Sequence, residues 1–336
     1  MHTVRVRYPG RICLLGEHCD WAGGSSLTVP LPMGIDIRAE PARDGVTIKS
    51  ELDGDLIEGH WSWDSPRPEN GPLRFVPAAM AEMKAAGMTL RPAELWVRSN
   101  LPAGRGFSSS AAFTLGVLDA MARVGGACLA AGALVELAYA VEHSRLGIKC
   151  GRLDPAACAA GQPLVLNWVR GSDGQIEMTT KRIEPLGTLH LVVAAFDRPR
   201  DTQRILNTLN RHHSGPVQDA DGDAVREAIS EFASAAERGA NALRNGNLQV
   251  LGDAMNRAQG VYEENLADRF ASTRAPQLIQ TVGALRNRGA MGAKFSGAGG
   301  DGSVVALFAT ENEARATCIW LEEGDLQAWY VPVGAT

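Results

Sequence analysis

The sequence lacks the long apolar runs of a membrane protein. No run of 18 apolar residues occurs in the 336 residues, so no membrane-spanning helix is expected. The first seven residues alternate as in a strand and contain no apolar signal region, which favours a cytoplasmic protein. The six cysteines are scattered without a C-x-x-C pair, so we expect free thiols and neither a zinc site nor a disulfide framework.

A strong charge of one sign is also missing. The chain has 33 lysines and arginines against 38 aspartates and glutamates, and its net charge of −5 argues against a general nucleic-acid binder. Its length is too great for one small core, so two domains are expected. We place the boundary beside the apolar strand predicted at 189–196, which gives domains of residues 1–187 and 188–336.

Common nucleotide-binding signatures are absent or out of place. The chain has no Walker A sequence and neither the His-Arg-Asp nor the Asp-Phe-Gly motif of protein kinases. Gly297, Gly299 and Gly302 fit G-x-G-x-x-G, but that fingerprint must open a helix. Residues 303–308 are predicted to form a strand instead, so a Rossmann dinucleotide site is not expected.

What the sequence does contain is a loop rich in glycine and serine at residues 101–112. It lies between a strand predicted at 95–99 and a helix predicted at 110–123, with Ser109 and Ser110 as expected N-cap residues. A helix start offers unpaired N–H groups and a partial positive charge, so this order of elements predicts a phosphate site. An ordinary capped helix after a turn is the alternative.

A second polar loop follows a short buried strand predicted at residues 12–15. Glu17, His18 and Asp20 crowd together between that strand and a diglycine turn. Carboxylates and imidazole accept from and donate to vicinal hydroxyl groups, so these side chains indicate a site for a polyhydroxy ligand. A solvated polar loop is the alternative.

The remaining periodicity predicts an alternation of strands and helices. Strands are expected at 4–8, 12–15, 163–168, 176–183 and 329–333, with a turn at Pro9-Gly10 and a strand pair across 27–37. Helices are expected at 73–86, 130–146, 202–209, 225–245, 248–266, 276–289 and 311–323, the last capped by Thr310. Residues 290–302 are expected to form a second glycine-rich loop.

Three stretches together resemble the motifs of the GHMP small-molecule kinases, which include galactokinase and mevalonate kinase. Residues 10–24 are similar to the galactokinase signature with its Gly-Glu-His-x-Asp core. Residues 102–112 are similar to the phosphate loop Pro-x-Gly-x-Gly-Leu-Ser-Ser-Ser-Ala, and residues 292–307 to the Gly-Ala-Gly-rich third motif. Each motif is weak alone, but the three follow the order and spacing of the family along nearly the whole chain.

The resemblance implies an α+β fold of two domains. The N-terminal domain would look like the second domain of ribosomal protein S5, and the C-terminal domain would be ferredoxin-like. It also implies an ATP-dependent sugar 1-kinase that needs Mg²⁺, with a small-molecule sugar as its partner. We expect no nucleic-acid or membrane partner, and a monomer or homodimer.

The resemblance assigns roles to individual residues. Asp154 would orient the acceptor hydroxyl or accept its proton, and Arg11 would face that aspartate. Ser110 and Glu142 would hold the metal, since Glu142 precedes Asp154 by the spacing found in galactokinases. The phosphate-binding residues would be Gly104, Gly106, Ser108, Ser109, Ser110 and Ala111.

The sugar-binding residues implied by the resemblance are Glu17, His18, Asp20, Gly151 and Arg152. Galactokinases have a mostly apolar run before the aspartate, whereas this chain has Lys149 and Arg152 there. Arg198 and Arg200 are expected on the facing domain. These cations favour an anionic sugar, such as a uronic acid or a heptose or octose phosphate. The alternative is that they point to solvent or only balance ATP.

Several other functions stay open. They are galactokinase proper, a mevalonate-type isoprenoid kinase, and a catalytically silent sugar sensor. Asp20 favours the galactokinase type over the mevalonate type, and the retained Ser110, Glu142 and Asp154 favour an enzyme over a sensor. The chain departs from the family at Asp301, usually glycine, and from the galactokinase signature at Cys19, Trp21 and Ala22.

Overall fold

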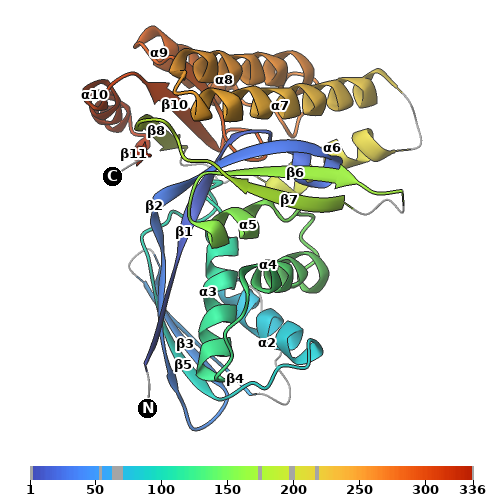
Figure 1. Cartoon of the computed structure of the whole chain (residues 1–336), viewed down its shortest axis with the longest axis vertical. Coiled ribbons are helices and arrows are strands. Elements are labelled where there is room, and N and C mark those ends of the chain that lie inside the picture. Colours follow the sequence, from blue (N-terminus) through green and yellow to red (C-terminus); the bar gives the residue numbers. More distant parts are fainter. Residues whose placement is uncertain are drawn as a thin grey trace. The chain divides into compact units, whose positions relative to one another are not determined.

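The computed structural model describes residues 3–52, 55–62, 71–172, 176–196, 201–215 and 219–334 (Figure 1). It divides into two compact units, which are described separately. The first unit comprises Met1–Arg11, Leu31–Ala103 and Phe107–Gly161, and the second comprises Ile12–Pro30, Gly104–Gly106 and Gln162–Thr336. The boundary expected between residues 187 and 188 falls inside the second unit. As a boundary between evolutionary domains it stays a prediction.

The first unit is built on a twisted sheet whose strands follow the order β4-β3-β5-β2, with β1 also paired to β2. β3 runs parallel to β5, while β4 and β2 run antiparallel to their neighbours β3 and β5. The strands are β1 Val4–Leu15, β2 Gly24–Pro41, β3 Val46–Leu52, β4 Asp55–Trp61 and β5 Ala93–Ser99.

The turn expected at Pro9-Gly10 is wrong, because β1 passes through it as one strand. Gly10 is needed there for close packing: a Cβ on it would lie 2.7 Å from the Phe107 carbonyl oxygen. Gly34 on β2 has the same role, since its Cβ would lie 2.6 Å from the carbonyl oxygen of Tyr8. A glycine–proline pair therefore marks a close approach of backbones here and not a reversal of the chain.

The strand pair expected across residues 27–37 is likewise one long strand, β2. Its residues 24–28 pair with β6, and its residues 35–41 pair with β5. Pro30 and Pro32 lie between these two stretches, where neither of those ladders needs their missing N–H.

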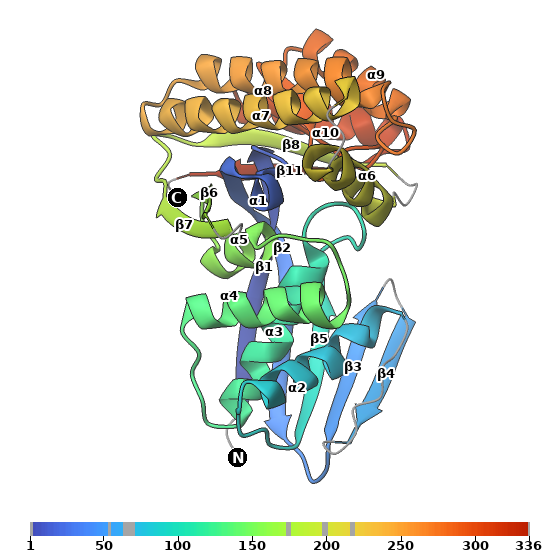
Figure 2. The ribbon, with the colours of Figure 1, turned by 90° about the vertical axis from the view of Figure 1, so that its right-hand side faces the viewer.

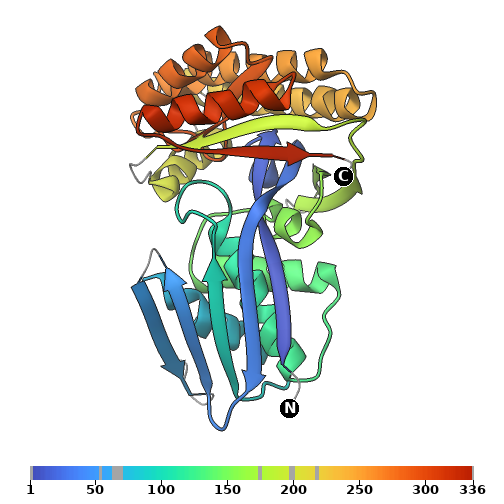
Figure 3. The same ribbon diagram turned by 90° about the vertical axis from the view of Figure 1, so that its left-hand side faces the viewer.

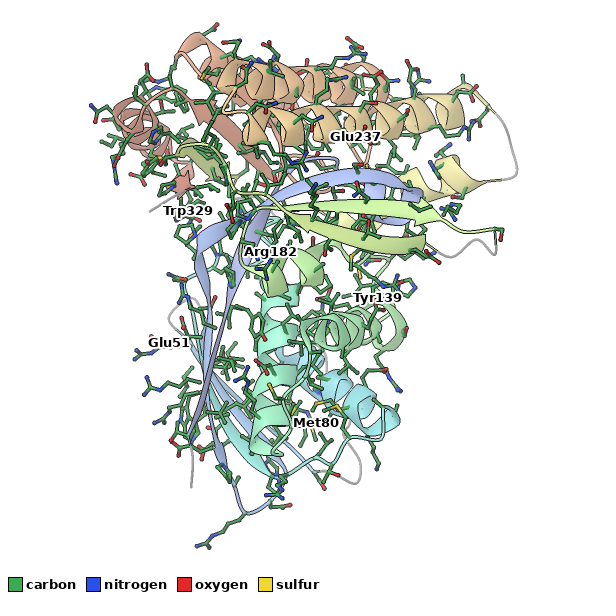
Figure 4. All side chains as sticks on the ribbon, viewed as in Figure 1. Glu51, Met80, Tyr139, Arg182, Glu237 and Trp329 are labelled. Carbon is green, nitrogen blue, oxygen red and sulfur yellow. The ribbon has the colours of Figure 1, made fainter. Side chains whose placement is uncertain are left out.

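Helices cover one face of the first unit's sheet (Figure 2), and Figure 3 views the same sheet from its other side. Met80 of α2 lies in the core between these helices and the sheet and is 1% exposed (Figure 4). The helix expected at 130–146 ends at Ala140 and continues as a π-helical turn. The elements are η1 Pro72–Arg74, α2 Phe75–Ala85, α3 Ser109–Val124, α4 Ala131–Ala140, the π-turn η2 Val141–Arg145 and α5 Leu153–Ala160.

The second unit contains a four-stranded sheet in the order β11-β8-β10-β9. β10 pairs antiparallel with β8 and β9, and β11 pairs antiparallel with β8. Helices α8, α9 and α10 pack on this sheet, and α7 packs against α8. The elements are β8 Leu189–Ala195, α6 Thr202–Ser214, α7 Ala220–Arg244, α8 Leu248–Tyr262, the π-turn η3 Glu263–Ala267, α9 Pro276–Asn287, β9 Gly292–Phe295, β10 Ser303–Phe308, α10 Glu311–Glu323 and β11 Gln327–Val333.

Three further elements belong to the second unit. β6 Leu164–Arg170 pairs with the start of β2 and with β7 Ile176–Arg182, and the short helix α1 Cys19–Ala22 lies in what was expected to be a loop. The glycine-rich loop expected at 290–302 is also partly wrong. Its residues 292–295 form β9, because all four are buried and pair with β10.

Caps fix the ends of two helices in the second unit. Thr310 caps α10 in a capping box with Glu313, as the sequence predicts. The N-cap residue of α9, Ala275, has no side chain that can cap. Asp301 supplies the cap from the third motif, since its Oδ1 accepts from the Leu278 N–H at 2.9 Å. Asp301, which stands where the family usually has glycine, therefore links the glycine-rich loop to the start of α9.

All six cysteines are free. No helix in the described ranges is both long enough and apolar enough to cross a membrane.

Candidate active site

A buried arginine and a half-buried aspartate form the centre of the site in the first unit. The Arg11 Nε atom donates to Asp154 Oδ1 at 2.9 Å, and its Nη2 atom forms a salt bridge with the same oxygen. The Arg11 side chain is 6% exposed, whereas that of Asp154 is 33% exposed. The carboxylate is thus fixed by a cation behind it while part of it stays open to a ligand.

Two elements place this pair. Arg11 follows the close approach at Gly10 on β1, and its N–H donates to the Phe107 carbonyl oxygen at 3.2 Å. Asp154 is in the first turn of α5, as the sequence predicts. β1 therefore connects the salt bridge to the loop that precedes α3.

Glu142 lies beside this pair on the π-turn and is 6% exposed. Burial, and next the charge of Asp154, raise the pKa of Glu142 to about 7, although a hydrogen bond with Ser110 lowers it. Its Oε1 atom is buried and has no hydrogen-bond partner among the described residues. A buried, unpartnered carboxylate oxygen is costly unless a ligand or cation completes it.

The start of α3 presents the predicted phosphate-binding residues. The N-cap is Ser108, and the expectation that Ser109 or Ser110 caps the helix is wrong because both are already helical. Ser108 adopts a left-handed backbone with φ of 59°, and its buried Oγ makes no cap hydrogen bond. The first helical bond runs from the Ala112 N–H to the Ser108 carbonyl, so the N–H groups of residues 109–111 point out of the helix start.

The glycines of this loop also turn with positive φ. Gly104 has φ of 71° and Gly106 has φ of 83°, conformations that side chains strain to adopt. Between them, the Arg105 guanidinium donates to the carbonyl oxygen of Phe196 at the end of β8. The sequence prediction of a turning loop followed by a helix start is confirmed in its backbone conformation.

The donor set around Glu142 and Ser110 fits Mg²⁺. Mg²⁺ prefers oxygen ligands and is commonly held by one or two carboxylates together with substrate phosphates and water. Glu142 offers an unpartnered oxygen next to the Ser110 hydroxyl, with Asp154 nearby. No cluster of three or more His, Cys, Asp or Glu within the described residues could hold a metal ion alone.

Two of the cations predicted to meet an anionic sugar, Lys149 and Arg152, lie within the described residues. Lys149 is exposed, and Gly151 is buried. Arg152 donates from Nε to both carboxylate oxygens of Glu136, at 2.8 and 2.9 Å. Arg198 and Arg200 lie outside the described residues.

Glu17, His18 and Asp20, which the resemblance assigns to sugar binding, lie in the second unit. Glu17 forms a salt bridge with Lys294 of β9, and the two side chains are 1% and 0% exposed. Nothing in the sequence prediction assigned a role to Lys294. Residues 290–302 were expected to form a loop, whereas Lys294 lies in the buried strand β9, where a lysine requires a charged partner.

His18 and Asp20 flank the start of α1. His18 is 5% exposed and has a left-handed φ of 67°, whereas Asp20 is half-buried. The His18 ring meets the Trp21 ring edge-on at 5.7 Å, and the Trp21 ring meets that of His213 from α6 at 5.4 Å. Arg170 holds this segment by donating to the carbonyl oxygen of Trp21 at 3.1 Å.

Two family models match the chain. The model for the GHMP kinases N terminal domain matches residues 74–162, and the GHMP kinases C terminal model matches residues 240–318. The first includes residues 102–112 together with Glu142 and Asp154, and the second includes residues 292–307.

Curated relatives include two kinds of kinase. Galactokinase of Chloroflexus aggregans is 31% identical over 164 residues, which are 48% of this chain and 41% of that protein. Galactokinase of Roseiflexus sp. is 26% identical over 90% of this chain and 83% of its own. Mevalonate kinase of Aeropyrum pernix is 26% identical over 91% of this chain and 89% of its own.

The fold matches a solved galactokinase. The structure of Lactococcus lactis galactokinase complexed with galactose superposes with a TM-score of 0.80 at 20% identity, covering 99% of this chain and 94% of that one. This likeness confirms the α+β, two-domain fold that the motifs imply. From the two family matches, their order along the chain and this shared fold, we conclude that the chain belongs to the GHMP kinase family and is a galactokinase-like, ATP-dependent kinase.

Proposed function

We propose that the protein transfers the γ-phosphoryl group of ATP to the anomeric C1 hydroxyl of a neutral hexose of the galactose type. The observation that carries this proposal is the Arg11–Asp154 salt bridge beside the buried carboxylate of Glu142. Such a group of charges suits an acceptor hydroxyl that must lose a proton to become a phosphate ester. The galactokinases among the relatives support the sugar as the acceptor.

Asp154 acts on the acceptor hydroxyl. Its exposed carboxylate oxygen accepts the O–H proton while the hydroxyl oxygen attacks the γ-phosphorus and ADP leaves. Arg11 orients the carboxylate because its guanidinium binds Oδ1 from the buried side.

The start of α3 takes the phosphates of ATP. The N–H groups of residues 109–111 and the positive end of the helix dipole stabilise negative oxygens. Ser110 and Glu142 would hold Mg²⁺, which supplies charge neutralisation on the transferring phosphoryl group when bound.

Asp20 and His18 are the proposed sugar ligands of the second unit. Glu17 belongs to the trio by motif, but its buried salt bridge with Lys294 favours a supporting role. Asp20 is half-buried on the same turn, and its carboxylate is a type of group that accepts from sugar hydroxyls. In this assignment His18 and Asp20 bind the sugar, and Glu17 stabilises the turn that carries them.

A neutral sugar is the better match to the cations that the structure describes. Arg152 is engaged by Glu136, and Lys149 is exposed to solvent. An anionic sugar would need an arginine fork that is free to bind its phosphate or carboxylate. The basis for expecting a uronic acid or a sugar phosphate is therefore weak among the described residues, and galactokinase relatives favour the neutral alternative.

A mevalonate-type activity is the second candidate, since Aeropyrum pernix mevalonate kinase aligns with 91% of the chain. Asp20 argues against it, because a carboxylate on the substrate turn repels the mevalonate carboxylate and suits neutral hydroxyl groups. A silent sugar sensor is disfavoured by the retained group of Arg11, Glu142 and Asp154.

The test is ADP release by the full chain with ATP, Mg²⁺ and a panel of acceptors. The panel contains galactose and its epimers, galacturonic acid, a heptose 7-phosphate and mevalonate. We expect turnover with a neutral hexose and little turnover with the anionic acceptors. ³¹P NMR should show that the product carries its phosphate on C1. A preference for mevalonate or for an anionic sugar contradicts the proposal, as does binding of sugar and ATP without ADP release.

A further inference from the structure

We infer that Arg152 is a positioning residue, whose guanidinium fixes the start of α5 and with it the carboxylate of Asp154, and that it does not contact the substrate. This inference rests on the proposed function, and it replaces the sugar-binding role that the motif implies for Arg152. The group that carries it consists of Glu136, Tyr139, His143 and Arg152, and is called here the Arg152 cluster.

The Arg152 side chain is held on two sides. Its Nε atom lies 2.8 and 2.9 Å from the two oxygens of Glu136, and its Cζ atom lies 4.2 Å from the centre of the Tyr139 ring. Both partners project from α4, on which Figure 4 labels Tyr139. A guanidinium that is both stacked and bound to a carboxylate has little freedom to turn towards a ligand.

The backbone of Arg152 is part of α5. It is the N-cap residue, and its carbonyl oxygen accepts the Ala156 N–H at 3.0 Å. The helix has no side-chain cap at this end. The link from Arg152 to Glu136 therefore ties the first turn of α5 to α4, and Asp154 lies in that turn two residues later.

One member of the cluster, His143, lies on the π-turn that carries Glu142. Tyr139 stacks on His143, with ring centres 4.9 Å apart and planes 16° apart. His143 lies on the π-turn next to Glu142, whose carbonyl oxygen accepts the Ile148 N–H. The cluster therefore connects the first turn of α5, which carries Asp154, to the π-turn that carries Glu142.

Two magnitudes make the role testable. Glu136 is 55% exposed, and an exposed ion pair contributes little to overall stability. Misplacement of a reacting group by about 1 Å can cost on the order of 100-fold in rate. Loss of the pair should therefore lower turnover far more than it lowers the melting temperature.

The experiment compares Arg152→Ala and Glu136→Gln in the full chain, with the best neutral sugar as acceptor. We expect each variant to lower kcat by roughly 10- to 100-fold, with KM values for sugar and ATP changed by less than about twofold. Lys149→Ala is the matched control, because it removes an exposed cation from the same loop and should leave both constants unchanged. Arg152→Lys should not restore kcat, since an ammonium cannot form the stacked, two-point contact.

The variant of Glu136 separates the alternatives. If Arg152 binds substrate, Arg152→Ala raises KM for the sugar and Glu136→Gln has no effect, which overturns the inference. If both variants keep the wild-type kcat, the cluster is only a surface contact, which also overturns it.

A measurement without turnover separates this inference from the proposed function. Amide hydrogen exchange across residues 150–157 should be faster in Arg152→Ala and in Glu136→Gln than in the wild type, and unchanged in Lys149→Ala. If no acceptor supports ADP release, the proposed function fails, and this exchange pattern still decides the positioning role. Unchanged exchange in both cluster variants would contradict it.

Discussion

The carboxylate of Glu17 and the ammonium group of Lys294 form a salt bridge that solvent does not reach. Lys294 also donates to the carbonyl oxygen of Phe295 and lies 4.2 Å from the centre of its ring. A buried pair of charges is costly to form and more costly to break, since the remaining charge has no water around it. The pair joins the turn that carries His18 and Asp20 to strand β9.

Lys294→Met should lower the free energy of unfolding by about 3–5 kcal/mol, because it leaves the Glu17 carboxylate buried without the ammonium group of its ion pair. Urea denaturation measures the change. The double variant with Glu17→Gln should recover a large part of the loss. Lys49→Met, which breaks the more exposed pair with Glu94, is the control and should cost no more than about 1 kcal/mol. Equal losses in the two lysine variants would contradict the argument.

Asp154→Asn should keep the affinity for ATP and lose most of the turnover, because the acceptor hydroxyl loses its charged partner. Steady-state kinetics and an ATP-binding titration measure the two effects. Asp36→Asn is the matched control, since Asp36 pairs with Arg7 in a surface salt bridge. A fall in kcat of less than about tenfold would leave the role of Asp154 unsupported.

Ser110→Ala and Glu142→Gln should each raise the Mg²⁺ concentration that gives the half-maximal rate. Each variant removes one oxygen donor from the candidate metal site. A Mg²⁺ titration of the rate at fixed ATP measures the shift. Identical titration curves for the wild type and both variants would remove these residues from the metal site.

The raised pKa of Glu142 predicts how stability depends on pH in the absence of metal. The pKa is about 7 in the folded chain against 4.5 for the ordinary side chain, so between these values the folded state binds more protons than the unfolded state. Stability due to this group is therefore fully present below pH 4.5 and falls as pH rises to about 7, by about 3 kcal/mol.

Unfolding free energies in EDTA at several pH values test this. The difference between wild type and Glu142→Gln isolates the carboxyl group, because glutamine does not titrate. The wild type should lose stability relative to the variant as pH rises from about 4.5 to 7. A difference that is flat with pH, or that grows in favour of the wild type, would show that the carboxyl is not desolvated.

Gly10→Ala should destabilise the protein by about 1–3 kcal/mol and raise KM for ATP. The new methyl group would meet the Phe107 carbonyl and the Leu101 side chain, and so displace the loop before α3. Gly132→Ala is the control, because no atom lies within 4 Å of its new Cβ and alanine favours a helix. Thermal unfolding and ATP kinetics measure both changes.

Much of the site was predictable because it is encoded locally. The loop at 101–112 and the helix after it follow from glycine, serine and apolar spacing, and the motif order gave Arg11, Glu142 and Asp154 as candidates. The salt bridge between Arg11 and Asp154 joins residues 143 positions apart, so only the motif resemblance could suggest it.

The errors of prediction arose from contacts between distant segments. Pro9-Gly10 has the composition of a turn, but glycine is needed at position 10 because the backbone of Phe107 packs closely against it. For Arg152 the substrate-binding role stays a prediction, but its contacts with Glu136 and Tyr139 come from a neighbouring helix and could not be read from its own sequence context. Local sequence does not state which partner a charged side chain will meet.

The second unit is formed by segments that are far apart in the sequence, and this has a consequence for biosynthesis. Residues 12–30 belong to the second unit, yet their strand partner Leu164–Trp168 is translated about 140 residues later. At about 5–20 residues per second, this segment waits roughly 7–28 s on the ribosome before its partner exists. During that interval the strand Gly24–Thr28 lacks its partner β6. Its unpaired edge exposes the nascent chain to aggregation until the second half is made.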